Sequence, residues 1–341
     1  MRKVLIIAEA GVNHNGNIEL AKKMIDAACE AKADIVKFQT FKADKLVSRN
    51  AKMAEYQIKN ISSESLDNSQ YQMLKKLELN EEDHVILMNY CKSKGIEFLS
   101  TSFDDESIDL LRKLKIKIWK IPSGELTNKP LLQKIGAFNE NIIISTGMAL
   151  MSEIQDAIVI LIQSGTKRDN ITVLHCNTEY PTPMFDVNLN AMNEIKQKLN
   201  VRVGYSDHTL GIEIPIAAVA LGAEVIEKHF TLDRGMEGPD HKASLEPNEL
   251  LQMVESIRNI EVAMGSGLKQ PSSSEQKNII IARKSIHLNR DLTSGSIISA
   301  LDLIMKRPGD GISPMEYEEL IGKKINKDLK ADHKLSLSDF E

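Results

Sequence analysis

Eight short apolar segments, separated by longer stretches with helical periodicity, dominate the first 265 residues. The apolar segments cover residues 4–8, 34–39, 97–101, 117–123, 142–146, 172–176, 201–205 and 224–230. The amphipathic stretches include residues 18–32, 81–94, 104–114, 152–163, 213–221 and 247–264. Eight strand–helix units in a chain of this size predict an α/β fold, a (β/α)8 TIM barrel. A doubly wound parallel sheet is the alternative, but the chain has no glycine-rich dinucleotide turn to support it.

The chain changes character after these eight units. A polar run rich in glycine, proline and serine, residues 265–274, interrupts the pattern. We therefore predict a barrel domain over residues 1–265, a linker over 266–283 and a small β-rich domain over 284–341. Residues 50–72 form an additional polar insertion after the second predicted strand. In a barrel, a loop at this point lies over the catalytic face.

Charge and composition exclude several classes of partner. The 43 basic and 48 acidic residues give a net charge of -5 without a long basic block, so we expect no nucleic acid partner. No apolar stretch approaches the roughly 18 residues of a membrane span. The N-terminal apolar run ends at Glu9 and is too short for a signal peptide. The three cysteines are scattered, which favours a reducing, cytoplasmic location.

Polar side chains follow every one of the eight predicted strands. They include Glu9, Lys37, Gln39, Thr101, Lys120, Ser123, Glu125, Ser145, Asn177, Thr178, Tyr180, Asp207, His208 and His229. A single lysine or serine at a strand end is usually a solvated loop residue. Because the carboxyl ends of all barrel strands meet at one face, their repetition over eight strands predicts a polar active-site face.

Two histidines occupy the ends of neighbouring strands. His208 follows the seventh strand and His229 ends the eighth, with the acids Glu9, Asp207 and Asp240 expected nearby. Either histidine alone would more often be structural, but the pair predicts a divalent metal site. Two imidazoles plus water and substrate oxygens suit Mn²⁺, with Mg²⁺ or Co²⁺ as alternatives. We assign His14 to a turn near the site.

The other histidines are expected to have no special role. His84, on a predicted helix, and His287 and His333, in the small domain, are predicted to be ordinary surface residues.

A second cluster of polar residues suits an anion. Lysines supply point charges, hydroxyls donate hydrogen bonds, and a glycine exposes backbone N–H groups. The residues concerned are Lys37, Lys120, Ser123, Ser145, Thr146 and Gly147. Since neither a P-loop nor a GxGxxG motif is present, a small phosphorylated anion fits better than a nucleotide.

Many blocks of the chain, in one order, match a known family. The stretches are AEAGVNHNG (8–16), VKFQTFKADKL (36–46), AEYQIKN (54–60), KIWKIPSGEL (117–126), ISTGM (144–148), LHCNTEYPTP (174–183), GYSDHT (204–209), EKHFTLD (227–233), GPDHKAS (238–244) and KRPGDGISP (306–314). Along its whole length the chain resembles the bacterial sialic acid synthase (N-acetylneuraminate synthase) family. The resemblance implies a TIM barrel followed by a small antifreeze-like (SAF, β-clip) domain.

The resemblance also implies roles for individual residues. His208 and His229 are implied as the metal ligands. Contacts to phosphoenolpyruvate are implied for Lys37, Thr101, Lys120, Ser123 and Ser145, with either Asn177 or Thr178 adding a contact. The implied catalytic residues are Glu9, beside the reacting carbons, Lys120, Glu125 and, as an alternate acid–base, Asp207.

The acceptor sugar is expected to contact a different set of residues from those that contact phosphoenolpyruvate. The resemblance implies contacts from Gln39, Tyr180 and Asp240, and from Arg307 of the small domain. In this family that arginine reaches into the partner subunit's barrel, which implies a domain-swapped homodimer.

The implied reaction joins phosphoenolpyruvate to an N-acylated hexosamine with C–O cleavage and release of phosphate. Similarity of FQTFKADKL and HCNTEYPTP to N-acetylmannosamine-using members favours N-acetylneuraminate synthase. The alternative is legionaminic acid synthase, which uses 2,4-diacetamido-2,4,6-trideoxymannose. A metal-dependent hydrolase on the same barrel is less well supported, because it would need neither Lys120 nor Arg307. Ser102 stands where relatives usually have proline, and its effect is left open.

Overall fold

The chain divides into two compact units, Met1–Ser266 and Gly267–Glu341. The structure, a computed structural model, describes residues 3–60 and 69–341, so part of the predicted insertion, residues 61–68, lies outside the described residues. The segment predicted as a linker is not all irregular. It contains helix α12 (Ser273–Ala282), which begins at a capping box formed by Ser272 and Glu275. This segment belongs to the second unit.

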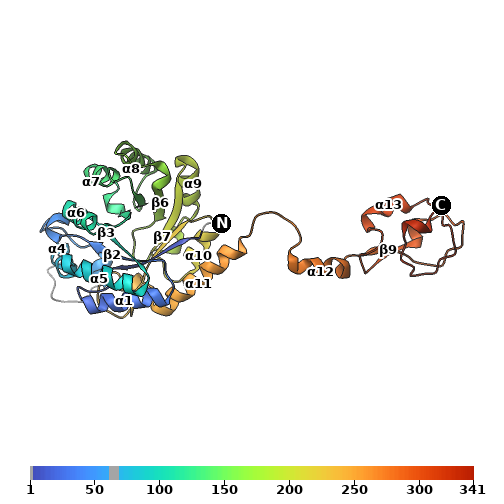
Figure 1. The fold of residues 1–341 in the computed structure, drawn as a ribbon, viewed down its shortest axis with the longest axis horizontal. Coiled ribbons are helices and arrows are strands. Elements are labelled where there is room, and N and C mark those ends of the chain that lie inside the picture. Colours follow the sequence, from blue (N-terminus) through green and yellow to red (C-terminus); the bar gives the residue numbers. More distant parts are fainter. Residues whose placement is uncertain (1–2, 61–68) are drawn as a thin grey trace. The chain divides into compact units, whose positions relative to one another are not determined.

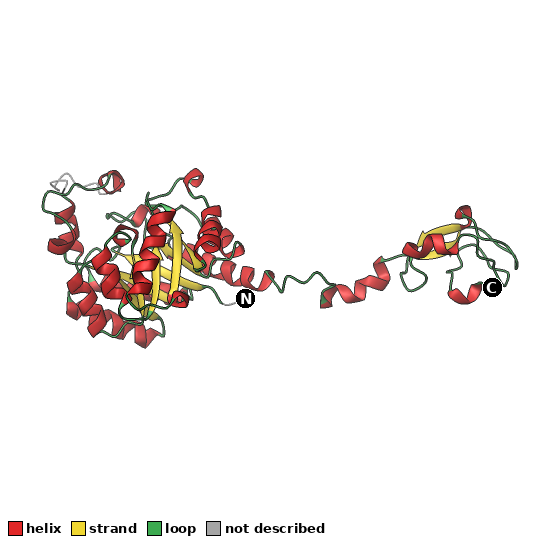
Figure 2. Ribbon diagram, turned by 90° about the horizontal axis from the view of Figure 1, so that it is seen from above, coloured by secondary structure: helices red, strands yellow, loops and turns green. Residues whose placement is uncertain are grey.

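The first unit is the predicted TIM barrel. Its strands are all parallel and pair in chain order, and β1 also pairs with β8, which closes the sheet. Figures 1 and 2 show these strands enclosed by helices. The strands are β1 (Leu5–Gly11), β2 (Ile35–Thr40), β3 (Glu97–Ser102), β4 (Ile118–Ile121), β5 (Asn141–Ser145), β6 (Ile171–Cys176), β7 (Arg202–Asp207) and β8 (Val225–His229).

Helices follow the strands and cover the outside of the sheet. They are α1 (Ile18–Glu30), α5 (Glu81–Lys94), α6 (Asp105–Lys113), α7 (Lys129–Gly136), α8 (Met151–Gln163), α9 (Asn190–Leu199), α10 (Glu213–Ala220) and α11 (Pro247–Ala263). Local signals fix their ends: a capping box of Asn80 and Asp83 begins α5, and Gly95 in the left-handed conformation ends it. The chain between β2 and α5 carries α2 (Ala43–Leu46), α3 (Glu55–Asn60) and α4 (Gln70–Leu77).

The interior of the barrel begins with an apolar layer. Side chains alternate between the two faces of a strand, so one residue in two points inward. The inward layer at mid-strand consists of Ile7, Ile35, Leu99, Ile143, Leu174 and Val225. Gly204 leaves room for this layer, because a Cβ at this position would lie 2.6 Å from Leu174 Cδ2 and 2.3 Å from the Val225 carbonyl oxygen.

The second unit is a small domain with its own core. Strands β9 (Ser285–Leu288) and β10 (Leu303–Lys306) pair antiparallel, and the short helix α13 (Tyr317–Leu320) follows. Its apolar core includes Ile286, Leu288, Ile298, Leu303, Ile312, Leu320, Ile325 and Leu335. This architecture confirms the prediction of a small β-rich domain after the barrel.

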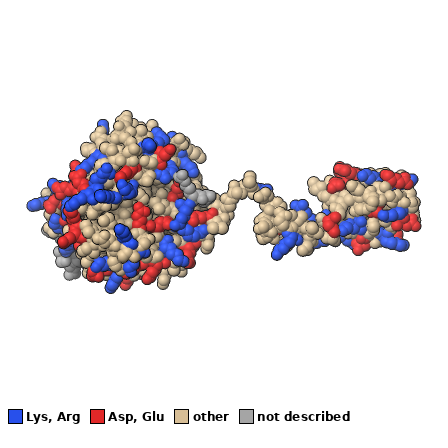
Figure 3. Space-filling model, in the orientation of Figure 1, with Lys and Arg blue, Asp and Glu red and all other residues tan. Residues whose placement is uncertain are grey.

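The surface carries charges of both signs. On the face drawn in Figure 3, basic and acidic side chains are interspersed over each unit. Within residues 3–60 and 69–341, no helix has the length and apolar composition needed to cross a membrane.

Candidate active site

A cavity of about 700 Å³ opens in the barrel unit, where the strands end. Most of the side chains predicted from the sequence line it: Glu9, Lys37, Gln39, Thr101, Lys120, Ser123, Glu125, Ser145, Thr178, Tyr180, His208, His229 and Asp240. Asn177, Asp207 and Arg307 are not among the lining residues. The structure thus brings together side chains from all eight strands or the loops that follow them.

A charged layer lies directly above the apolar layer of the barrel. All but one of its members follow an apolar residue of the inward layer by two positions, as Glu9 follows Ile7 and Glu227 follows Val225, and Ser206 follows Gly204. The layer consists of Glu9, Lys37, Thr101, Lys120, Ser145, Cys176, Ser206 and Glu227. Ser206, Cys176 and Glu227 were not assigned a role from the sequence.

Two lysines and two glutamates make close contacts in this layer. Lys37 Nζ lies 2.7 Å from Glu9 Oε2 and 3.5 Å from Glu227 Oε2. Lys120 Nζ donates to Glu227 Oε1 over 3.1 Å, and the Ser206 hydroxyl donates to the same oxygen over 2.9 Å. All four charged side chains are almost fully buried. Glu227 is therefore the central carboxylate of the cluster.

The two carboxyl groups differ in their proton affinity. Burial raises the pKa of Glu9 to about 7, although the Lys37 ammonium opposes the shift. Burial also acts to raise the pKa of Glu227, but Lys120 and Lys37 outweigh it and hold this pKa well below its ordinary value. Burial lowers the pKa of Lys120, whereas Glu227 and Glu9 outweigh burial and raise that of Lys37.

The cluster consequently has a surplus of positive charge. Two ammonium groups face one firmly ionised carboxylate, while Glu9 shifts towards its neutral form. An anionic ligand would compensate this surplus and favour the charged form of Lys120. Burying a cation without such a partner costs roughly several kcal/mol of desolvation free energy. The geometry suits a small polyanion.

Hydroxyl and backbone groups surround the lysines. The Gly147 N–H donates to Ser123 Oγ over 2.9 Å, and a Cβ at Gly147 would lie 2.5 Å from Thr178 Cγ2. Ser145 Oγ is buried with no hydrogen-bond partner among the described residues, which is typical of a group that a ligand satisfies. Thr146, predicted in this group, instead donates its hydroxyl to the Leu174 carbonyl and does not line the cavity.

The structure distinguishes between Asn177 and Thr178. Thr178 lines the cavity. Asn177 turns its side chain to its own loop, where Oδ1 accepts from the Glu179 N–H over 2.7 Å. Its carbonyl accepts from His208 Nδ1 over 2.5 Å, so Asn177 reaches the site only through the histidine.

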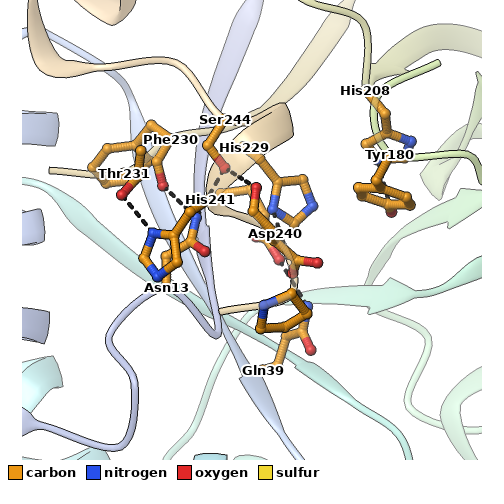
Figure 4. A network of polar contacts seen from close by, with 12 residues as sticks. Asn13, Gln39, Tyr180, His208, His229, Phe230, Thr231, Asp240, His241 and Ser244 are labelled. Atoms are coloured by element: carbon orange, nitrogen blue, oxygen red, sulfur yellow. Dashed lines mark hydrogen bonds and ion pairs between the residues drawn. The ribbon is translucent and has the colours of Figure 1, made fainter. Parts of the chain in front are cut away.

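His208 and His229 lie together at the edge of the cavity (Figure 4). Their ring centroids are 5.5 Å apart. Burial lowers the pKa of His208 to about 4 and that of His229 well below its ordinary value, so both rings are neutral. Because His208 Nδ1 donates to a carbonyl, its Nε2 carries the lone pair, 3.0 Å from the Tyr180 hydroxyl.

The donor set fits a divalent ion with two protein ligands. His229 Nδ1 is buried without a hydrogen-bond partner in the part of the chain that the structure describes, and Asp240 Oδ2 lies 3.9 Å away. No group of three or more His, Cys, Asp or Glu residues within residues 3–60 and 69–341 is arranged to hold a metal. An ion bound by two neutral imidazoles would take its other ligands from water and substrate.

Asp207 faces away from the cavity, which contradicts its predicted role as an acid–base residue. It immediately precedes His208 and therefore has the opposite orientation on β7. Its carboxylate is completely buried and accepts from Lys228 Nζ over 2.5 Å and from the N–H and hydroxyl of Thr209. With these bonds made outside the barrel, Asp207 fixes the end of β7 and has no access to substrate.

The loop after β8 is tied to the loop after β1 (Figure 4). Asn13 Nδ2 donates to the Phe230 carbonyl and to Ser244 Oγ, each over 2.9 Å. His241 bonds to the Thr231 hydroxyl over 2.7 Å. These contacts hold the segment that contains Asp240, a buried residue. Burial raises the pKa of Asp240 to about 7.

Two histidines predicted to lie at the surface are buried. His84 bonds to the Thr40 hydroxyl over 2.7 Å, and His287 lies on β9. His14 is also fully buried, and its Nδ1 accepts from the Gly16 N–H over 3.0 Å, as expected of a turn. Arg307 is exposed in the second unit, where its Nε donates to the Ala282 carbonyl.

The barrel, the cavity with its two buried lysines and the small antiparallel domain define a class of two-domain TIM-barrel proteins. Comparison with protein families narrows this class. The NeuB family matches residues 24–269 and the SAF domain matches residues 283–341. The chain belongs to the NeuB family, which confirms the resemblance and the fold.

Individual relatives match nearly the whole chain. The N,N'-diacetyllegionaminic acid synthase of Campylobacter jejuni is 56% identical over 332 residues, covering 97% of this chain and 98% of the relative. The enzyme of the same name from Legionella pneumophila is 50% identical, covering 96% and 91%. The crystal structure of the N-acetylneuraminic acid synthetase of Leptospira borgpetersenii has a TM-score of 0.71 at 36% identity, covering 82% and 90%.

These relatives favour the alternative acceptor over the one expected first. The motifs that suggested N-acetylneuraminate synthase include Gln39 on β2 and Thr178 and Tyr180 after β6, all three of which line the cavity. Barrel motifs of this kind are shared by synthases with different acceptors, so they carry little information about the sugar.

Proposed function

We propose that the protein is an N,N'-diacetyllegionaminic acid synthase. It condenses phosphoenolpyruvate with 2,4-diacetamido-2,4,6-trideoxymannose and releases phosphate. The observation that supports the chemistry is the buried cluster of Lys37, Lys120 and Glu227 beside two neutral histidines. The two relatives at 56% and 50% identity support the acceptor.

The reaction forms one carbon–carbon bond and, at C2, forms one carbon–oxygen bond to water and breaks the one to the phosphate's bridging oxygen. C3 of phosphoenolpyruvate attacks the aldehyde carbon of the open-chain sugar, and water adds at C2. The resulting tetrahedral intermediate loses phosphate with its bridging oxygen and leaves a ketone at C2. Lys37 and Lys120 stabilise the phosphate charge in a site shielded from water.

Proton transfer falls to Glu9. A pKa of about 7 lets this carboxyl group hold or release a proton near neutral pH, whereas Glu227 stays ionised between the lysines. His208 and His229 would hold a divalent ion, which would supply Lewis-acid polarisation of the aldehyde. Tyr180, stacked on His208 at 4.1 Å, restricts the orientation of that ring.

The acceptor assignment is tested by measuring phosphate release with each sugar. We expect kcat/KM for the diacetamido sugar to exceed that for N-acetylmannosamine by about tenfold or more. Equal or better use of N-acetylmannosamine would identify an N-acetylneuraminate synthase instead. Absence of phosphate release with either sugar, in metal-loaded protein, would overturn the synthase assignment.

We further propose a domain-swapped homodimer in which Arg307 completes the sugar site of the partner subunit's barrel. Its planar guanidinium suits an amide carbonyl or sugar hydroxyls. We expect Arg307→Ala and His229→Ala chains, each inactive alone, to regain activity after mixing and refolding. A random mixture would reach roughly a quarter of wild-type activity, because only half the dimers are mixed and each has one complete site.

The control for this mixture is the pair of single variants refolded separately. Native mass spectrometry of differently tagged chains measures how many mixed dimers form. If mixed dimers form and the sample stays as inactive as its parents, the exchange of Arg307 between subunits is wrong.

A further inference from the structure

One end of the active-site cavity is apolar. Its wall, here called the apolar lobe, consists of Val12, Phe41, Leu46, Met73, Leu74 and Leu77. Five of these residues belong to the chain that follows β2, including helices α2 and α4. The opposite end holds the charged cluster and the histidines. A cavity of this kind suits a ligand that is anionic at one end and apolar at the other.

The six side chains of the apolar lobe carry no hydrogen-bonding nitrogen or oxygen, although Glu55, Gln57 and Gln70 of the same segment also line the cavity. Leu46 and Leu74 are half-buried, and the other four members are buried. Gln57 lines the cavity nearby, but its Oε1 accepts from the Ala54 N–H over 2.9 Å. A hydroxyl group against this wall would lose hydrogen bonds to water without replacement, whereas a methyl group would not.

The strands relate the apolar lobe to the charged cluster. On β2, the inward positions run from Lys37 through Gln39 to Phe41, just beyond the strand end. At about 3.3 Å per residue, Phe41 lies about 13 Å beyond Lys37 along the strand direction. Phe103 follows Thr101 on β3 by two positions, as Phe41 follows Gln39 on β2. The lobe thus begins farther along the cavity than the anion site, just past the end of β2, and continues into the segment that follows this strand.

The position of the reacting carbon orients the acceptor. Its aldehyde carbon must lie next to phosphoenolpyruvate at the charged cluster, so the sugar carbon farthest from the aldehyde, C6, extends away from the lysines. In the acceptor of the proposed function, C6 is a methyl group. We propose that the apolar lobe binds this C6 methyl group and selects 6-deoxy acceptors over acceptors with a C6 hydroxyl. This inference rests on the proposed function.

The test uses two sugars that differ in a single oxygen atom. They are 2,4-diacetamido-2,4,6-trideoxymannose and 2,4-diacetamido-2,4-dideoxymannose, which carries the C6 hydroxyl. For the wild-type protein we expect kcat/KM to favour the 6-deoxy sugar by about tenfold or more. In Leu74→Asn, a near-isosteric change, that ratio should fall towards one while KM for phosphoenolpyruvate stays within about twofold.

Met53 provides the matched control. It belongs to the same apolar cluster but is not among the cavity-lining residues, so Met53→Gln should leave the ratio unchanged. Leu46→Asn, on α2, repeats the test at an independent position should Leu74→Asn fail to fold. If the wild type does not distinguish the two sugars, or if a folded lobe variant keeps the wild-type ratio, the inference is wrong.

The two proposals fail in different ways. The protein could use both diacetamido sugars equally well, and better than N-acetylmannosamine. In that case the apolar lobe does not distinguish a C6 methyl group from a C6 hydroxyl group, and the proposed function stands. If N-acetylmannosamine is the best acceptor, the proposed function itself fails.

Discussion

Replacing Lys120 by methionine is expected to lower kcat/KM for phosphoenolpyruvate by about a hundred- to a thousandfold. The substitution keeps the length of the side chain and removes a buried ammonium group that lies 3.1 Å from Glu227. Glu227 then has one lysine partner instead of two and repels the substrate phosphate. We expect KM for phosphoenolpyruvate to rise and kcat to fall in a phosphate-release assay.

Lys117 supplies the control for this variant. It lies three residues earlier and is mostly exposed, and its Nζ lies 3.6 Å from a carboxylate oxygen of Glu140. Lys117→Met should keep both kinetic constants within about twofold, since an exposed ion pair contributes little. Unchanged kinetics in Lys120→Met would remove Lys120 from the anion site.

Chelation of metal is expected to abolish activity, and Mn²⁺ to restore it. The proposed site has two imidazole ligands, His208 and His229, and no group of three or more His, Cys, Asp or Glu residues among the described residues could hold a metal ion, so the ion should exchange readily with EDTA. Removing one of the two protein ligands should abolish nearly all metal binding and nearly all turnover. His229→Ala is therefore expected to lack both turnover and Mn²⁺ binding, measured by titration calorimetry.

A histidine outside the barrel controls for general metal affinity. His333 lies in the second unit, where its Nε2 bonds to Asp339 Oδ2 over 3.0 Å. His333→Ala should retain Mn²⁺ binding with wild-type stoichiometry. Full turnover in the presence of EDTA, or Mn²⁺ binding by His229→Ala equal to that of the wild type, would contradict the assignment of the ligands.

The barrel could be predicted because its strands are buried on both faces. Such strands are continuous apolar runs, and the predicted runs match β1 to β8 with boundaries that differ by a few residues. Helix α12 was missed because glycine, proline and serine precede it and suggested a linker. The capping box of Ser272 and Glu275 was the signal for its beginning.

The site was predicted best where the residue chosen points inward. Glu9, Lys37 and Lys120 follow apolar inward residues by two positions, and all three line the cavity. Asp207 was chosen for its proximity to His208 in the chain, and that adjacency is the reason it points outward. Glu227 was overlooked although it lies two residues before His229 and shares its orientation.

Some features could not be predicted from patterns along the chain. The apolar lobe is built by residues of the β2–α5 segment that resemble an ordinary helix core, and only their common position at the cavity gives them a possible role. The burial of His84 likewise depends on the packing of α5 against the barrel rather than on its neighbours in the sequence.

The apolar layer beneath the charged cluster closes the interior of the barrel on that side. Ile7, Leu99, Leu174 and their neighbours close it from below, so ligands enter and leave by one mouth. If the protein has the proposed function, we expect an ordered kinetic scheme in which phosphoenolpyruvate binds first, at Lys37 and Lys120, and the sugar binds second. Sugar bound before phosphoenolpyruvate would obstruct the deeper subsite, so we expect excess acceptor to act as a competitive inhibitor with respect to phosphoenolpyruvate.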